Sequence, residues 1–599
     1  MSQRPKRNAR RPERLRKSGD NVLLPQNAST ETGAVPENSL SSNVAILPQL
    51  TETIVVHEDI ALGSTGTQTC GVEPRNSPAS QINSGMQWGN HSGLDEIKAG
   101  IENAYLKVVS WKSNIFPMPK NAIGKEAIKE LTRLLSLFNQ STCWGPVAIN
   151  MAIIFLPLML QKPSARSKGR DHTRYLLKRL ALWKEGNLED LISEGDEIQR
   201  RMKPGRKTEE SLSKGFTRLM LSGNVRQAVK LLDANDPVNG VHEVTEDVRK
   251  TLLEKHPKGK DAQEGVLDDR EIPRIEKVIF EEIDEVLVQR AAKALSGSGG
   301  PNRVDSEIWK QLLCSRAFGK LSDGLANAIA AMARLMCTEE IPFDHLHLLL
   351  DCRLVPLRKG ENGIRPIGIG ETLRRIIGKC VVKVVGSDIQ LASGALQTCA
   401  GHESGVEAAI HAMSDAFNEP SCEAVLLVDA ENAFNNLNRQ VSLHNLRRVC
   451  PQIHQFLQNT YQAPVRLHFG DGTHILSQEG VTQGDNLAMA MYSVSTRIII
   501  ETQKQATDSV KQVWFADDSA GVGDLDNLKI WWESLKANGP AYGYFPKPSK
   551  TCLIVKDAQL VDRANDLFGA DGGTTYRSSD RKRRLQKSLC RGEGAKVVE

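Results

Sequence analysis

Cysteine pairs and long apolar runs are missing from this sequence of 599 residues. Its eleven Cys include no Cys-x-x-Cys pair and no Cys/His cluster with zinc-ligand spacing, which favours a reducing compartment and argues against a zinc knuckle. The one long apolar run, 147–160, contains Asn150 and Pro157 and is shorter than the ~20 residues that span a bilayer. We therefore expect a buried helix there and no membrane span. No apolar core follows the basic amino terminus, so a secretory signal is not expected either.

The overall charge is small but unevenly distributed. Charged residues make up 25% of the chain, hydrophobic residues 40%, and the net charge is +5. Residues 1–17 nevertheless contain eight Lys or Arg against one Glu, and residues 577–591 contain seven against one Asp. Such blocks are more often solvated tails than specific sites, although they would also bind nucleic-acid phosphates or serve as a nuclear import signal.

Three acidic residues follow two short apolar segments. The run 424–428 predicts a buried strand that ends at Asp429, and the run 513–515 predicts another that leads to Asp517 and Asp518. A single Asp at a strand end is usually a turn or cap residue, but two adjacent ones repel each other unless a cation offsets their charge. Buried carboxylates in this pattern indicate hard divalent ions. Two such ions would activate a hydroxyl and stabilise a pyrophosphate leaving group.

The order of these segments resembles that of a reverse transcriptase. Asp429 with Phe434 is similar to motif A, Gln483-Gly484-Asp485 to motif B, and Phe515-Ala516-Asp517-Asp518 to motif C. The resemblance implies an α+β fold with right-hand polymerase fingers and palm, the palm being an antiparallel sheet with packed helices. It also implies RNA-directed DNA polymerase activity, in which a primer 3′-hydroxyl is extended with dNTPs on an RNA template. The primer would be DNA or RNA, and the cofactors two Mg²⁺ ions, with Mn²⁺ possible.

The resemblance assigns roles to residues around the acidic ones. Asp429, Asp517 and Asp518 would be catalytic and would bind metal, together with the backbone carbonyl of Ala430. Phe434 would lie under the sugar of the incoming nucleotide and leave no room for a 2′-hydroxyl, whereas plain core packing is the ordinary role of a Phe.

The loop at Gln483 and Gly484 would lie beneath the nascent base pair, with Gln483 near the template and Gly484 allowing close backbone approach. The family usually has Pro where this chain has Asn486. This departure is expected to cost stability more than activity.

Two further segments carry cations. The segment 352–370 predicts a β-hairpin with Lys359 near its turn and Arg365 on the returning strand, which resembles motifs 1 and 2 and would bind a triphosphate. A solvated hairpin with ordinary surface charges is the alternative. Downstream, Lys550 resembles the motif D lysine that protonates or steadies pyrophosphate, with Lys547 or a plain surface role as alternatives. A predicted helix over 371–385 would offer Arg374, Arg375 and Lys379 to the template backbone.

The sequence predicts five regions. They are a disordered basic and polar tail (1–95), a helical accessory region (96–270), fingers with the start of the palm (271–425), palm with motifs A to D (426–560) and a truncated thumb remnant with a basic tail (561–599). The accessory region could guide template or bind a partner, but packing against the enzyme is its simplest role.

The polymerase pattern stops after Phe568. We therefore expect a C-terminally truncated enzyme of a eukaryotic retrotransposon, with poor or absent processivity and an intracellular location in the nucleus, the cytoplasm or both. The alternative is a catalytically inactive, nucleic-acid-binding remnant of such an element, which would bind RNA or DNA without incorporating nucleotides.

Overall fold

The computed structural model describes residues 93–112, 114–140, 144–202, 209–223, 225–233, 240–360, 363–569 and 574–576. Both basic blocks and nearly all of the predicted tail lie outside these residues. Within the described ranges, no helix combines the length and the apolar character needed to cross a membrane.

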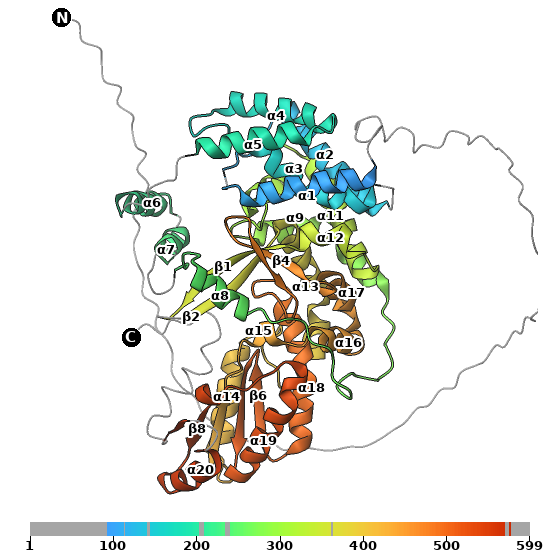
Figure 1. The fold of residues 1–599 in the computed structure, drawn as a ribbon. Helices are drawn as coiled ribbons and strands as arrows, with labels where there is room; N and C mark the ends of the chain where they lie inside the picture. Colours follow the sequence, from blue (N-terminus) through green and yellow to red (C-terminus); the bar gives the residue numbers. More distant parts are fainter. Residues whose placement is uncertain are drawn as a thin grey trace, which may run out of the picture. The chain divides into compact units, whose positions relative to one another are not determined.

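The first helices form a layered group. They are α1 (Leu94–Ser110), α2 (Ala122–Asn139), α3 (Gly145–Leu160), α4 (Gly169–Lys184) and α5 (Leu188–Arg201). α3 is apolar on all sides and buried, because α1, α2, α4 and α12 (Phe343–Leu350) pack around it. Figure 1 shows this group in blue to cyan. The predicted buried helix at 147–160 is confirmed.

Apolar residues recur at helical spacing over 175–199, but this segment forms parts of two helices and not one. α4 ends before Gly186, which has a φ of +76°, and the Asn187 side chain then caps α5 by accepting a hydrogen bond from the Asp190 N–H at 3.1 Å. A Gly-Asn pair between apolar repeats is a recognisable stop and start signal for helices.

Further helices connect this group to the two sheets. They are α6 (Glu209–Leu221), α7 (Val225–Asp233), α8 (Glu246–Glu254), α9 (Glu285–Ala294), α10 (Ser306–Cys314), α11 (Lys320–Thr338) and α13 (Thr372–Ser393), with a 3₁₀ turn at Lys277–Glu282. α11 packs against α2, α9 and α13. One hydrophobic core consequently extends from Ile101 in α1 to Phe568 in α20 (Val561–Phe568).

A four-stranded sheet contains the predicted hairpin. Its order is β2-β1-β4-β5, where β1 (Cys352–Lys359) and β2 (Gly363–Gly370) are antiparallel, β4 (Val465–His468) runs parallel to β1, and β5 (His474–Ser477) returns. The hairpin prediction is confirmed, with Lys359 opposite Gly363 at the turn. The sequence pattern does not predict β4 and β5, because an alternation over four residues is too short to stand out.

A five-stranded sheet contains the predicted buried strands. Its order is β6-β7-β3-β8-β9, from β6 (Lys511–Phe515), β7 (Asp518–Gly523), β3 (Ala424–Val428), β8 (Cys552–Val555) and β9 (Thr574–Tyr576). β3 pairs antiparallel with β7 and β8, but β9 runs parallel to β8. The sheet is therefore mixed, which corrects the purely antiparallel prediction, while the α+β class agrees with the observed helix and sheet content.

Helices cover both faces of this sheet. Val425 and Leu427 pack against α14 (Gly405–Asn418), while Leu426 and Val428 join the main core on the opposite face. α18 (Ala488–Ala506) and α19 (Leu525–Asn538) pack together, and α19 contacts β3 and β7 (Figure 1). The remaining helices are α15 (Ala433–Asn436), α16 (Arg439–Val449) and α17 (Pro451–Tyr461), with 3₁₀ turns at Gly539–Tyr542, Pro548–Lys550 and Ala558–Leu560.

Candidate active site

The strand register brings the predicted acidic residues together. Val428, the last residue of β3, pairs with Ser519 of β7, and Phe515 pairs with Asp518 across the β6–β7 turn. Asp429 therefore emerges beside the turn that contains Asp517. A carboxylate distant in sequence thus reaches the acidic pair because β3 and β7 are hydrogen-bonded neighbours.

A buried glutamine holds the β6–β7 turn. Ala516 has a φ of +55°, a left-handed conformation that is unfavourable for a residue with a Cβ. The Gln397 side chain accepts from the Ala516 N–H at 2.8 Å and donates to its carbonyl at 3.1 Å. Gln397 is fully buried, so these bonds compensate the strained turn and fix the place where Asp517 begins. Nothing in the local sequence pattern marks Gln397 for this role.

The electrostatics of Asp517 connect the acids with the predicted cations. Burial raises the pKa of this carboxyl, the charge of Asp429 raises it further, and the charges of Lys359 and Arg365 lower it. The hairpin of the four-stranded sheet therefore faces the acidic end of the five-stranded sheet. Tyr544, fully buried, donates to the Asp517 carbonyl at 3.0 Å and adds a second support for the turn.

The two candidate motif D lysines have separate partners. The Lys550 Nζ lies 2.9 Å from Oδ2 of Asp429, whereas the Lys547 Nζ lies 2.8 Å from Oε1 of Glu431. The Lys547 N–H also donates to the Asp429 carbonyl at 2.8 Å. Of the two lysines, Lys550 is thus the one whose ammonium contacts a predicted catalytic carboxylate. It ends a 3₁₀ turn rather than lying on a strand, because β8 begins only at Cys552.

The donors predicted to bind metal have suitable chemistry, although their present geometry is not that of a metal centre. Among the described residues, no group of three or more His, Cys, Asp or Glu side chains is arranged to hold an ion. Asp429 and Asp517 nevertheless bring like charges together at adjacent strand ends, and burial of Asp517 makes that charge costly. The Ala430 carbonyl is not used by the two hydrogen bonds of the bridge to Pro546, which come from the Asp429 carbonyl and the Glu431 N–H. Oxygen donors of this kind suit a hard divalent cation.

The predicted sugar-contacting residue lies against a second ring. Phe434, half-buried in α15, stacks on Tyr492 of α18 with ring centroids 4.7 Å apart and an interplanar angle of 27°. Burial raises the pKa of Tyr492, and the charges of Asp517 and Asp518 raise it further. The stacked pair therefore lies next to the acidic turn.

The predicted motif B loop is attached to the hairpin sheet. The Gln483 carbonyl accepts from the Gly368 N–H of β2 at 2.8 Å. Gly484 has a φ of +108°, and a Cβ there would lie 2.7 Å from the Gly368 carbonyl oxygen. Glycine is thus required both by conformation and by the close approach of two backbones.

Two arginines of α13 are held by contacts within the protein. Arg374 is 5% exposed, forms an ion pair with Asp485 and donates to the Leu350 carbonyl at 2.9 Å. Arg375 donates to the carbonyls of Ser296 and Ser298 at 3.0 and 2.9 Å. The prediction of a template contact is wrong for Arg374, because its buried guanidinium group is used by Asp485 and the Leu350 carbonyl. For the half-buried Arg375, whose bonds go to loop carbonyls, it stays a prediction. The same holds for Lys379.

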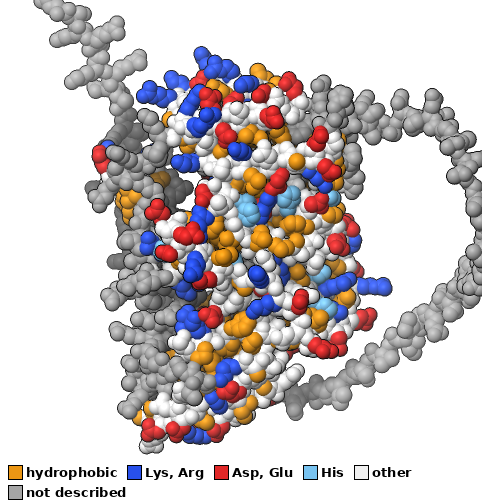
Figure 2. Space-filling view, in the orientation of Figure 1, with side chains coloured by type: hydrophobic (Ala, Val, Ile, Leu, Met, Phe, Trp, Pro, Cys, Tyr) orange, Lys and Arg blue, Asp and Glu red, His pale blue; other side chains and the backbone are white. Residues whose placement is uncertain are grey.

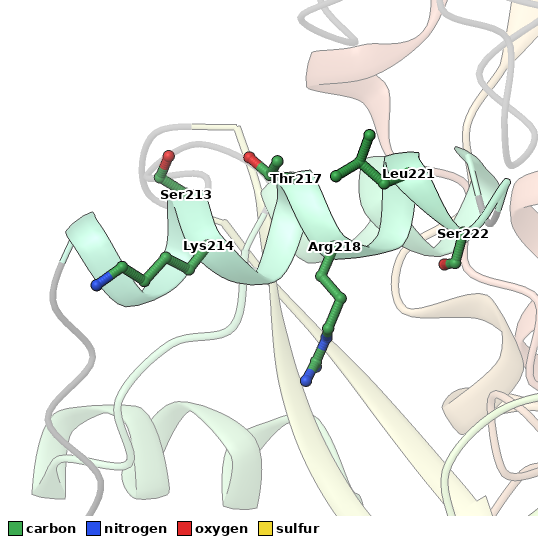
Figure 3. A pocket seen from close by; sticks show the side chains of 6 residues that line it. All are labelled: Ser213, Lys214, Thr217, Arg218, Leu221 and Ser222. Carbon is green, nitrogen blue, oxygen red and sulfur yellow. The ribbon is translucent and has the colours of Figure 1, made fainter. Parts of the chain in front are cut away.

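Surface charge and cavities add little to this site. On the face shown in Figure 2, Lys and Arg side chains are interspersed with Asp and Glu rather than gathered in one basic patch. A hollow of about 500 Å³ is lined by Ser213, Lys214, Thr217, Arg218, Leu221 and Ser222. Figure 3 shows that these side chains all come from α6 and the residue after it, and none belongs to the acidic site.

The comparisons with known proteins address this same part of the chain. Residues 357–570 match the family model described as reverse transcriptase (RNA-dependent DNA polymerase). The matched range contains Lys359, Arg365, Asp429, Asp517 and Lys550, and it supports a reverse transcriptase domain within this chain. A comparison with curated proteins found no match.

Proposed function

We propose that this chain is an RNA-directed DNA polymerase that extends a primer 3′-hydroxyl with dNTPs on an RNA template. The observation that carries the proposal is that two sets of residues of opposite charge, one from each sheet, come close to each other. The β3–β7 register places Asp429 beside the Asp517 turn, and the charges of Lys359 and Arg365 act on the same Asp517. The family match over the same residues supports this reaction class.

Each residue group has a separate task in this proposal. Asp429, Asp517 and Asp518, with the Ala430 carbonyl, would hold two Mg²⁺ ions, or Mn²⁺ in their place. Bound there, the ions supply Lewis-acid stabilisation of the nucleophile and of the leaving group. The primer 3′-oxygen forms a bond to the α-phosphorus as the bond to pyrophosphate breaks. Lys359 and Arg365 bind and orient the triphosphate from the hairpin side.

The remaining residues set substrate choice and product release. Phe434, supported by Tyr492, occupies the space of a 2′-hydroxyl, so deoxyribonucleotides are favoured. Gln483 and Gly484 support the nascent base pair on the template side. Lys550 balances the charge of Asp429 and steadies or protonates the departing pyrophosphate.

The proposal extends to the organisation and origin of the chain. Residues 271–425 would correspond to fingers with the start of the palm and 426–560 to the palm, and a DNA or RNA primer would be used. The source would be a eukaryotic retrotransposon acting in the nucleus or cytoplasm.

Primer extension tests the reaction directly. The full chain is incubated with an RNA template, a DNA primer, dNTPs and Mg²⁺ or Mn²⁺, and elongation is followed on a sequencing gel. We expect elongation by the wild type and none by an Asp517→Asn, Asp518→Asn double variant. Asp508→Asn, a change at an exposed residue before β6, is the matched control and should elongate normally. Salt-sensitive RNA binding without elongation by the wild type would contradict the proposal and favour an inactive nucleic-acid-binding remnant.

A further inference from the structure

A segment upstream of the matched domain runs along the candidate site. Residues 255–270, here called the strap, follow α8 and are outside helices and strands. An irregular backbone must find hydrogen-bond partners elsewhere. The strap finds them in side chains of 432–448 and in Glu479, whose carboxylate accepts from the Lys260 N–H at 2.7 Å.

Successive side chains bind the strap along its length. The bonds join Ala262 N–H to Gln440 Oε1 at 2.7 Å, Asp268 N–H to Asn445 Oδ1 at 2.8 Å, Asn445 Nδ2 to the Val266 carbonyl at 3.2 Å and Arg448 Nε to the Arg270 carbonyl at 2.7 Å. The strap is therefore a fixed part of the site's surroundings.

The first residue of the strap is attached to the segment that carries Asp429. Asn432 and Asn435 both donate through Nδ2 to the Lys255 carbonyl, at 2.8 and 2.7 Å. On its other side, α8 packs Leu252 against Cys352 and Leu354 of β1. Lys255 is consequently held between the two sheets whose charged ends form the candidate site.

The ammonium of Lys255 is within electrostatic reach of the lysines of that site. Burial lowers the pKa of Lys255, and the charges of Lys359, Lys547 and Lys550 lower it further, while Glu431 opposes them. Like charges are thus brought together at a half-buried place. Such an arrangement is unfavourable unless an anion offsets it.

Two of these four lysines form ion pairs with carboxylates, and for the other two the described residues show none. Lys550 pairs with Asp429 and Lys547 with Glu431, whereas within the described ranges neither Lys255 nor Lys359 forms an ion pair with a carboxylate. These two cations, one from the strap and one from the β1–β2 hairpin, feel carboxylates only beyond ion-pair distance, Lys255 that of Glu431 and Lys359 those of Asp429 and Asp517. An anion with several charges at one place, such as a triphosphate, would satisfy both.

We propose that Lys255 is a further substrate-binding residue, whose ammonium contacts the triphosphate of the incoming nucleotide opposite Lys359. This inference rests on the proposed polymerase function and adds a residue outside the range 357–570 that matches the family. The upstream region would then complete the nucleotide site instead of only packing against it.

Substitution of the side chain, leaving the backbone bonds in place, tests this role. Lys255→Met in the full chain should raise the KM for dNTP by about tenfold, the effect of losing roughly one charge-assisted hydrogen bond, with kcat within about twofold. Lys255→Arg should restore most of the affinity. Lys258→Met, at an exposed position of the same strap, is the matched control and should leave KM unchanged.

Two outcomes in this assay would overturn the assignment. One is a dNTP KM for Lys255→Met equal to that of Lys258→Met. The other is weaker binding of primer–template with an unchanged dNTP KM, which would place Lys255 on nucleic-acid backbone instead. Equal melting temperatures of the two variants would show that the fold is retained.

Direct binding of inorganic tripolyphosphate separates this inference from the proposed reaction. The affinity is measured by calorimetry for the wild type, Lys255→Met and Lys258→Met. Binding that weakens about tenfold in Lys255→Met alone supports the site even if no variant elongates a primer, in which case the proposed function fails by itself. No tripolyphosphate binding by the wild type, or equal binding by all three proteins, would overturn the inference.

Discussion

The two sheets contribute opposite charges to the candidate site and hold them in different ways. The five-stranded sheet supplies carboxylates at the end of β3, a fully buried central strand paired on both sides. The four-stranded sheet supplies Lys359 and Arg365 on a hairpin that is half-exposed near its turn. The carboxylates are therefore fixed by the core and by register, and the cations by hairpin geometry. In the proposed function neither set would bind a nucleotide alone, so changes in each sheet should have different consequences.

The largest effect on activity is expected at Asp429, the residue that follows the central strand β3. Asp429→Asn removes one charge and leaves the β3–β7 register intact, so kcat in primer extension should fall at least about a thousandfold with little change in melting temperature. Glu431→Gln, two residues later and paired with Lys547, is the control and should retain activity within about threefold. Similar losses in both variants would mean that the register does not single out Asp429.

The next largest effect concerns the contact between motif B and the hairpin sheet. Gly484→Ala introduces a Cβ that would lie 2.7 Å from the Gly368 carbonyl oxygen at a φ of +108°. We expect the free energy of unfolding to fall by about 3 kcal/mol in urea denaturation. Gly386→Ala, in α13 where a new Cβ meets nothing within 4 Å, should be neutral or slightly stabilising. Equal stability of the two variants would show that the loop can move away from β2.

A pH-dependent effect is expected at the junction of β2 and α13. Glu371 is 1% exposed, and burial raises its pKa from the ordinary value of 4.5 to about 8. The folded protein therefore binds this proton more tightly than the unfolded chain, and stability is lost as pH rises from 4.5 to about 8.

Replacing the acid with its amide removes this dependence. Glu371→Gln keeps an oxygen to accept from the Asn302 N–H, so its free energy of unfolding above pH 8 should exceed that of the wild type by about 2 kcal/mol. The difference should disappear near the ordinary pKa of 4.5. Glu340→Gln, at an exposed position, is the control in chemical denaturation across this pH range. A constant difference at every pH would refute the assignment to Glu371.

The smallest effect is expected on nucleotide selectivity, and it tests the role of the stacked Phe434–Tyr492 pair. Phe434→Val shortens the side chain that stacks on Tyr492, and discrimination between dNTP and NTP should fall about tenfold in kcat/KM. Phe417→Val, at a buried position of α14 in the separate core on the other face of β3, would lower stability without changing the ratio. An unchanged ratio in Phe434→Val would assign Phe434 to core packing only.

The sequence is most informative where one pattern determines both burial and chemistry. The apolar run 424–428 before Asp429 predicts the strand that the structure shows, and the sequence of 352–370 predicts a hairpin with its turn in the observed place. Long-range pairings are not visible in this way. Nothing near Gln397 announces its bonds to Ala516, and the charge of Arg374 predicts an exposed contact although the side chain is buried against Asp485. The strap shows no helical or strand periodicity from which its position could be predicted. Its backbone N–H groups bond to side chains that are distant in sequence.

The continuous core has a consequence for any shortened form of this protein. Apolar side chains of α2 and α3 pack on α11 and α12, which precede the matched range 357–570 and in turn support α13 and α17 within it. A fragment cut at residue 357 would expose those apolar faces to water, so we expect it to aggregate or to survive only with a chaperone. In evolutionary terms, we expect the upstream helices to be inherited with the matched part as one folding unit rather than exchanged as a separate module.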